Sequence, residues 1–212
     1  MRDRPILFSA PMVRAILDGR KTQTRRIVKN CGRLPEFRGP RGCNDDVTCW
    51  GWEDGETGDH IAIGAPDPES AHGRYLPCPH GVPGDRLWVR EPFAFISDCR
   101  HDDPGTAALA AGAFYRADEI SDCGDIKRWR PSIHMPRWAS RITLEISSVR
   151  VQRLNDISAA DALAEGMTFP ESIEWGNDPK DAFFGLWEHL HGEGSWAANP
   201  WVWVVEFKRL TP

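Results

Sequence analysis

The feature that most restricts the fold is an alternation of apolar and polar side chains at residues 141–154, with a bend expected near Ser147 and Ser148. Ile142, Leu144 and Ile146 alternate there with polar residues. Successive side chains of a strand point to opposite faces, so this pattern predicts a strand with one face on the core. The core is therefore expected to be built around a sheet.

Other segments predict short strands and short helices. Ser9 and Gly19 are typical of the two ends of a helix, and Ser158 followed by Asp161 is typical of a capping box. Further strands are predicted at residues 22–28, 87–89 and 201–210, and a further helix at residues 180–191. Strands separated by short helices predict the α+β class, as a small mixed β-barrel with flanking helices.

Two long stretches interrupt this pattern. Residues of about 30–82 and 97–130 are rich in Gly, Pro and Asp and have no sustained period, which is typical of irregular insertions. A chain of 212 residues is long for one core and short for two. We therefore predict a single domain, residues 1–212, with two insertions.

Membrane, metal and cofactor sites are not predicted. The longest apolar run, residues 201–205, is five residues long, so we expect a cytoplasmic protein with no membrane partner. Reduced thiols are then expected rather than disulfides. Cys31, Cys43, Cys49 and Cys78 lack the tight spacing of a zinc site, so we predict neither a metal nor a cofactor.

Charge is distributed in blocks along the chain. The net charge is −5, which argues against bulk electrostatic binding of long nucleic acids. Residues 14–41 nevertheless hold nine basic side chains against two acidic ones, and residues 127–153 hold seven against one. If these blocks meet in the fold, they form a local surface for a nucleotide or a short strand, whereas separate blocks are only solvated faces.

Three motifs in a fixed order resemble the ASCH domain family of the PUA-like superfold. They are Gly-Arg-Lys-Thr-Gln-Thr-Arg-Arg at residues 19–26, Gly-Asp-Arg-Leu-Trp-Val at residues 84–89 and Val-Val-Glu-Phe-Lys at residues 204–208. Residues 132–142 and 199–203 further resemble the longer ASCH proteins of bacteriophages and prophages. The resemblance implies a PUA-like barrel with a cleft that binds RNA or modified nucleosides.

One branch of that family, the small bacterial 4-acetylcytidine amidohydrolases, is similar in a lysine, a threonine and a glutamate. The resemblance implies that Lys21, Thr24 and Glu165 are catalytic. A lysine of lowered pKa can take the proton of the Thr24 hydroxyl, while Glu165 orients the lysine or protonates the leaving amine. Residues 21 and 24 share a face only if the chain is not one unbroken strand between them.

Further side chains are expected to bind the substrate. Trp138 and Trp201 are candidates for stacking on a base, with arginines reaching phosphate. Glu91 either lines the cleft or pairs with Arg90. The complete predicted binding set is Arg20, Arg25, Arg26, Glu91, Arg137, Trp138, Arg141 and Trp201.

Three functions remain open from the sequence. The first is an amidohydrolase that removes an acyl group from N4-acylated cytidine. The second is a non-catalytic module that binds a modified nucleoside or single-stranded RNA or DNA. The third is a phage assembly factor that uses the acidic insertion as a partner surface.

Overall fold

The computed structural model describes residues 1–30, 32–39, 46–63, 74–98, 112–118, 126, 128–168 and 178–210. It confirms the predicted α+β class. The largest sheet has the strand order β1-β7-β10-β11-β2. These strands are β1 (Asp3–Leu7), β7 (Arg86–Arg90), β10 (Thr143–Arg153), β11 (Trp201–Leu210) and β2 (Gln23–Ile27). Within the described residues no strand pairing joins β1 to β2, so a closed barrel stays a prediction.

The chain forms two compact units, and each combines stretches that are distant in the sequence. Unit 1 comprises Met1–Thr22, His80–Ser147 and Phe207–Pro212. Unit 2 comprises Gln23–Pro79 and Ser148–Glu206. Each unit is described by itself below.

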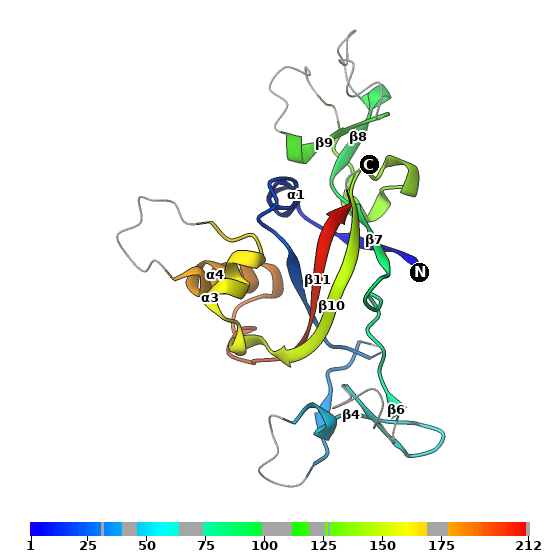
Figure 1. Ribbon diagram of the computed structural model, residues 1–212, viewed down its shortest axis with the longest axis vertical. Helices are drawn as coiled ribbons and strands as arrows, with labels where there is room; N and C mark the ends of the chain where they lie inside the picture. Colours follow the sequence, from blue (N-terminus) through cyan, green and yellow to red (C-terminus); the bar gives the residue numbers. More distant parts are fainter. Residues whose placement is uncertain are drawn as a thin grey trace. The chain divides into compact units, whose positions relative to one another are not determined.

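Unit 1 is built on β1 and β7, which pair in parallel from Asp3 opposite Arg86 to Leu7 opposite Arg90 (Figure 1). Helix α1 (Ala10–Leu17) follows β1 directly and has its buried residues on one side of the helix. It ends before Gly19, whose φ of 74° is readily adopted by glycine alone. The ends of this helix are those that the sequence predicts.

A two-stranded sheet completes unit 1. Strands β8 (Phe93–Phe95) and β9 (Ala113–Tyr115) pair antiparallel, with Phe95 opposite Ala113. Two short 3-10 helices are important for the site, η3 (Arg116–Asp118) and η5 (Arg137–Ala139). The former follows β9 without a break, and α1 contacts it.

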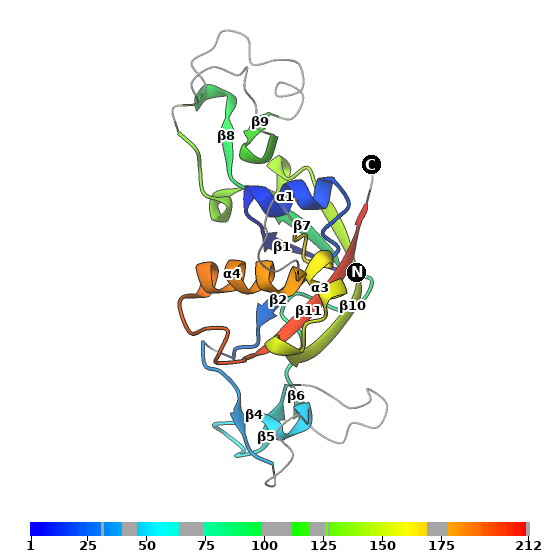
Figure 2. The same cartoon turned by 90° about the vertical axis from the view of Figure 1, so that its left-hand side faces the viewer.

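Unit 2 contains the pair β2 and β11 and two helices, α3 (Ala159–Ala164) and α4 (Pro179–His191). The helices lie side by side (Figure 2). Their buried side chains Phe183 and Trp187 pack with Val202 and Val204 of β11. This cluster is the apolar core of unit 2.

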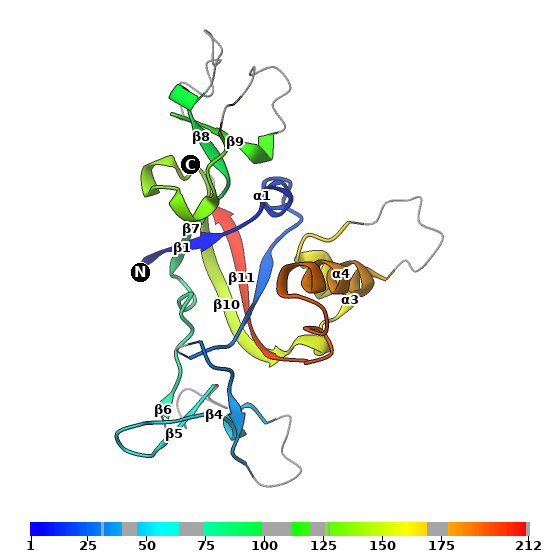
Figure 3. The same cartoon turned by 180° about the vertical axis from the view of Figure 1, so that it is seen from behind.

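The sequence analysis missed a small sheet in the insertion at residues 30–82. The missed strands are β3 (Glu36–Phe37), β4 (Trp50–Glu53), β5 (His60–Ala62) and β6 (Arg74–Tyr75), the last three of which are labelled in Figure 3. Strands of two to four residues are too short to establish a period of two, which explains the omission. None of the described helices has the length and apolar character needed to cross a membrane.

Candidate functional site

Lys21 lies in unit 1, at the turn that follows α1. The backbone N–H groups of Arg20 and Lys21 both donate to the carbonyl of Ala15 at 2.9 Å. The Lys21 side chain is 2% exposed, and its Nζ lies 5.6 Å from the centre of the Phe8 ring. Strand β2 starts only at Gln23, so residues 21 and 24 do not belong to one unbroken strand.

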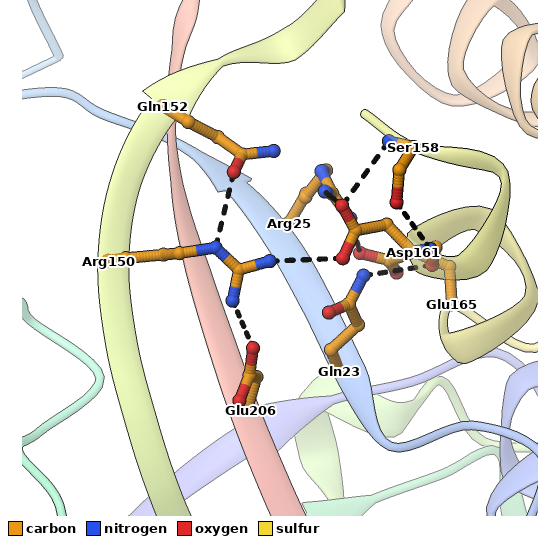
Figure 4. A network of polar contacts seen from close by, with 8 residues as sticks. All are labelled: Gln23, Arg25, Arg150, Gln152, Ser158, Asp161, Glu165 and Glu206. Carbon is orange, nitrogen blue, oxygen red and sulfur yellow. Dashed lines mark hydrogen bonds and ion pairs between the residues drawn. The ribbon is translucent and has the colours of Figure 1, made fainter. Parts of the chain in front are cut away.

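Two side chains of β2 in unit 2 point toward α3 (Figure 4). Gln23 Nε2 donates to the backbone carbonyl of Asp161 at 2.8 Å. Arg25 Nη1 donates to Glu165 Oε1 at 3.2 Å, and Arg25 Nη2 lies 3.2 Å from Asp161 Oδ2. Arg25 thus pairs with both carboxylates of the helix.

The geometry of α3 explains why these carboxylates lie together. Ser158 accepts a hydrogen bond from the Asp161 N–H at 3.0 Å, and Asp161 Oδ2 accepts one from the Ser158 N–H at 3.3 Å. This is the capping box that the sequence predicts. Asp161 and Glu165 are four residues apart, so they lie on the same side of the helical turn.

A second arginine reaches the same helix from β10. Arg150 donates to Asp161 Oδ1 at 3.0 Å and to Gln152 Oε1 at 3.2 Å, and it also pairs with Glu206. We call this set of contacts the α3 network. Its members are Gln23, Arg25, Arg150, Gln152, Ser158, Asp161, Glu165 and Glu206.

The charged side chains of the α3 network form ion pairs with one another. The Arg25 side chain is fully buried, and such a cation is tolerated in a protein interior only when it is paired. Burial raises the pKa of Asp161, but hydrogen bonds from Ser158 and the charge of Arg25 outweigh it and hold the pKa below its usual value. The network therefore keeps Asp161 ionised and paired.

Thr24 leaves β2 on the opposite face. Alternation along the strand places the side chains of Gln23 and Arg25 on one face and Thr24 on the other. Because Arg25 contacts Glu165, the Thr24 hydroxyl and the Glu165 carboxylate lie on different sides of β2. The catalytic roles suggested by the resemblance need both groups at one substrate atom, an arrangement this strand does not provide.

The remaining arginines of the motif differ in environment. Arg20 of unit 1 is exposed and pairs with Asp18 at 2.8 Å. Arg26 of unit 2 is partly buried, and burial lowers its pKa while Glu165 opposes this. Arg20 is thus the more exposed of the two cations.

Glu91 and Arg141, both predicted to bind substrate, bind each other within unit 1. Arg141 Nε and Nη2 donate to the two oxygens of Glu91 at 2.9 and 3.1 Å. Arg141 also donates to Asp118 at 2.8 Å and lies 3.9 Å from the centre of the Tyr115 ring. Burial raises the pKa of Glu91, and Arg141 opposes this. Glu91 therefore pairs with Arg141 and not with Arg90.

Trp138 of unit 1 is placed quite differently. Its side chain is 63% exposed, and its ring stacks on Phe95 with centres 5.9 Å apart and an angle of 18°. Arg137, its neighbour in η5, pairs with Asp3 at 3.5 Å and lies over the Trp88 ring. Trp138 is thus a large aromatic surface open to solvent.

Trp201 of unit 2, the other residue predicted to stack on a base, is not open in this way. It is 4% exposed, and its ring contacts Trp50 with centres 6.0 Å apart. The Arg153 guanidinium lies 4.3 Å from the centre of the Trp201 ring and 4.2 Å from that of Trp50. The protein's own side chains occupy the stacking surface of Trp201.

In the part of the chain that the structure describes, no group of three or more His, Cys, Asp and Glu side chains has the arrangement of a metal site. Cys49 and Cys78 belong to that part. Cys31 and Cys43, the other two cysteines considered as zinc ligands, lie outside the described residues.

Sequence reasoning missed Arg150 and Phe95, and assigned Asp161 a capping role alone. The four-residue spacing of Asp161 and Glu165 was an available signal for a shared cation. Arg150 and Phe95 are brought to their partners only by tertiary packing, so no local pattern identifies them.

Comparison with known proteins gives no further assignment. No protein-family model, no curated protein and no solved structure matches the chain. The resemblance to ASCH proteins therefore remains an expectation drawn from the motifs themselves.

Proposed function

We propose that this protein binds single-stranded nucleic acid and that one unpaired base stacks on Trp138. The observation that carries the proposal is the exposure of this ring. Trp138 is 63% exposed, and one face of its ring stacks on the Phe95 ring. A tryptophan held in this way offers a flat aromatic surface to any base.

One arginine contacts this aromatic pair, and a second is the sequence neighbour of Trp138. The Arg130 guanidinium lies 4.6 Å from the centre of the Phe95 ring and pairs with Asp98 at 3.0 Å. Arg137 is half-exposed beside Trp138. We call Trp138, Phe95, Arg130 and Arg137 the Trp138 platform. Aromatic rings with neighbouring cations are the usual elements of proteins that bind single strands without strong sequence preference.

Hydrolysis of N4-acylated cytidine is the second candidate, favoured by the burial of its three side chains. Lys21, Thr24 and Glu165 are among seven buried polar or charged residues in the described part of the chain. Burial of such groups is common at reactive sites, although structural ion pairs cause it as well. The pairing of Glu165 with Arg25 and the opposite orientation of Thr24 favour binding over hydrolysis.

Fluorescence anisotropy of a labelled oligo-dT of about 12 nucleotides tests the binding proposal. Trp138→Ala is expected to weaken binding by about 5- to 100-fold, because stacking contributes about 1–3 kcal/mol per base. Trp138→Phe should retain most of the affinity, since phenylalanine keeps an aromatic face. Phe184→Ala, which removes another exposed ring, is the matched control.

Two results would decide against this proposal. Equal affinities of the wild type and Trp138→Ala would remove the platform from the binding site. Release of cytidine from 4-acetylcytidine by the wild type, abolished by Thr24→Ala, would establish the hydrolase instead.

A further inference from the structure

A cavity of about 390 Å³ opens in unit 1 at the start of α1. Arg14 and Arg116 line it from two different elements, and its other lining residues are Ser9, Ala10, Pro11 and Pro92. The volume is within the range of small-molecule sites. The described residues of the lining include two cations and a hydroxyl but no carboxylate, so their polar groups are suited to an anion.

Hydrogen bonds fix the Arg14 side chain and the Arg116 backbone beside this cavity. Arg14 Nη1 donates to the carbonyl of Ala117 at 3.4 Å, which directs it toward η3. The backbone N–H of Arg116 donates to the carbonyl of Pro92 at 3.0 Å. The Arg14 guanidinium is therefore directed to the short helix that carries Arg116, and this helix is bound to the loop before β8.

Carboxylates near these segments are engaged elsewhere. Glu91 precedes Pro92, and Asp118 lies two residues after Arg116. Both carboxylates accept hydrogen bonds from Arg141. The cavity thus keeps a positive lining although acidic residues flank it in the sequence.

The cavity and the Trp138 platform are carried by the same two-stranded sheet. Pro92 comes directly before β8 and Arg116 directly after β9, while Phe95 ends β8 and supports Trp138. Three residues of a strand span about 10 Å. A single-stranded nucleic acid of a few nucleotides is therefore long enough to contact both the cavity and the Trp138 platform.

We propose that the cavity lined by Arg14 and Arg116 binds a phosphate group of the strand whose base stacks on Trp138. Guanidinium groups bind the phosphate oxygens, and the alanine and proline walls contact the adjoining sugar. This inference rests on the proposed nucleic-acid binding. It adds that the ligand must carry a charged backbone at a defined distance from the stacked base.

Two ligands and two variants test the inference. The ligands are oligo-dT with its normal phosphodiester backbone and oligo-dT of the same length with an uncharged methylphosphonate backbone. Arg116→Gln is expected to weaken phosphodiester binding about tenfold and to lower the salt slope, log K against log salt concentration, by about 0.7, the value for one phosphate contact with a single strand. Binding of the methylphosphonate ligand should not change, whereas Trp138→Ala should weaken both ligands.

The controls separate the two proposals. Arg116→Lys should retain most of the affinity, because it keeps the charge, and Arg33→Gln should have no effect, since it removes an exposed charge from unit 2. Wild-type affinity and salt slope in Arg116→Gln, with a normal defect in Trp138→Ala, would overturn the phosphate site alone. A defect in Arg116→Gln but none in Trp138→Ala would keep the phosphate site and overturn the stacking proposal.

Discussion

The α3 network and the Trp138 platform both contain arginines paired with carboxylates, but they differ in how far their side chains are buried. In the α3 network each arginine reaches a carboxylate, and the guanidinium of Arg25 is fully buried between Asp161 and Glu165. In the platform an aromatic ring is left 63% exposed beside a half-exposed Arg137. The charged side chains of the first region are paired within the protein, and the second has an aromatic ring that remains accessible to a ligand.

This difference distinguishes side chains that stabilise the fold from side chains that are available to bind a ligand. Buried ion pairs are strongly destabilised when one partner is removed, because the other charge is left in the interior. Exposed rings and cations contribute little to folding but are available for contacts with a partner. We therefore assign stability to the α3 network and binding to the platform.

The largest effect that tests this contrast is expected from Glu165→Ala. The substitution leaves the buried Arg25 with Asp161 as its carboxylate partner in α3 and should lower the free energy of unfolding by about 3 kcal/mol, measured by urea denaturation. Trp138→Ala should lower it by at most about 0.5 kcal/mol, and so should the control Glu193→Ala at an exposed acid.

The double substitution Arg25→Met with Glu165→Leu sharpens this result. It removes both charges and replaces them with apolar side chains, so it should recover most of the loss. Equal losses for Glu165→Ala and Trp138→Ala would contradict the division into a structural and a binding region.

The longer helices and strands could be predicted from local patterns, whereas the short strands β1, β8 and β9 were missed along with the small sheet at residues 30–82. The capping box of Ser158 and Asp161 predicted the start of α3, and strand β11 has the predicted bounds. In α4, however, Phe184 and Leu190 are exposed whereas Phe183 and Trp187 are buried, because the core of unit 2 covers only a narrow stripe of the helix.

Predictions for the site were less complete for a physical reason. Sequence motifs suggested which side chains could carry chemistry but not which would form ion pairs with one another. Arg25 and Glu165 are 140 residues apart and Glu91 and Arg141 are 50 apart, so their pairing depends on tertiary structure. Trp138 and Trp201 look alike as tryptophans near arginines, and only packing leaves the first exposed and the second covered.

A smaller effect is expected from the caps of two helices. Ser158→Ala removes the hydroxyl that accepts the Asp161 N–H, and should lower the free energy of unfolding by about 1 kcal/mol. Ser9→Ala is the matched control, because the Ser9 side chain makes no capping hydrogen bond to α1. Thermal or urea unfolding that ranks the two variants in the reverse order would show that the α3 network does not depend on its cap.

The smallest effect concerns the pH dependence of stability, to which Asp161 of unit 2 and Glu91 of unit 1 should contribute with opposite signs. The pKa of Asp161 is held below its usual value, so its stabilising contribution is present above the pKa of the unfolded chain, about 3.9, and is lost as pH falls through the lower folded pKa. Burial raises the pKa of Glu91, so its unfavourable contribution is present above the folded pKa and is relieved as pH falls through it.

Two variants separate these contributions in urea denaturation measured from about pH 7 to about pH 3. The stability lost in Asp161→Asn should shrink as pH falls, because the wild-type carboxylate becomes protonated and gives up its own contribution. The stability of Glu91→Gln relative to the wild type should instead fall as pH falls, since the native wild type binds a proton that its unfolded chain does not yet bind. If stability depended on pH in the same way in both variants, the prediction would be contradicted. Arg141 would then hold Glu91 ionised as firmly as Ser158 and Arg25 hold Asp161, and the pKa values of the two carboxylates would be shifted in the same direction.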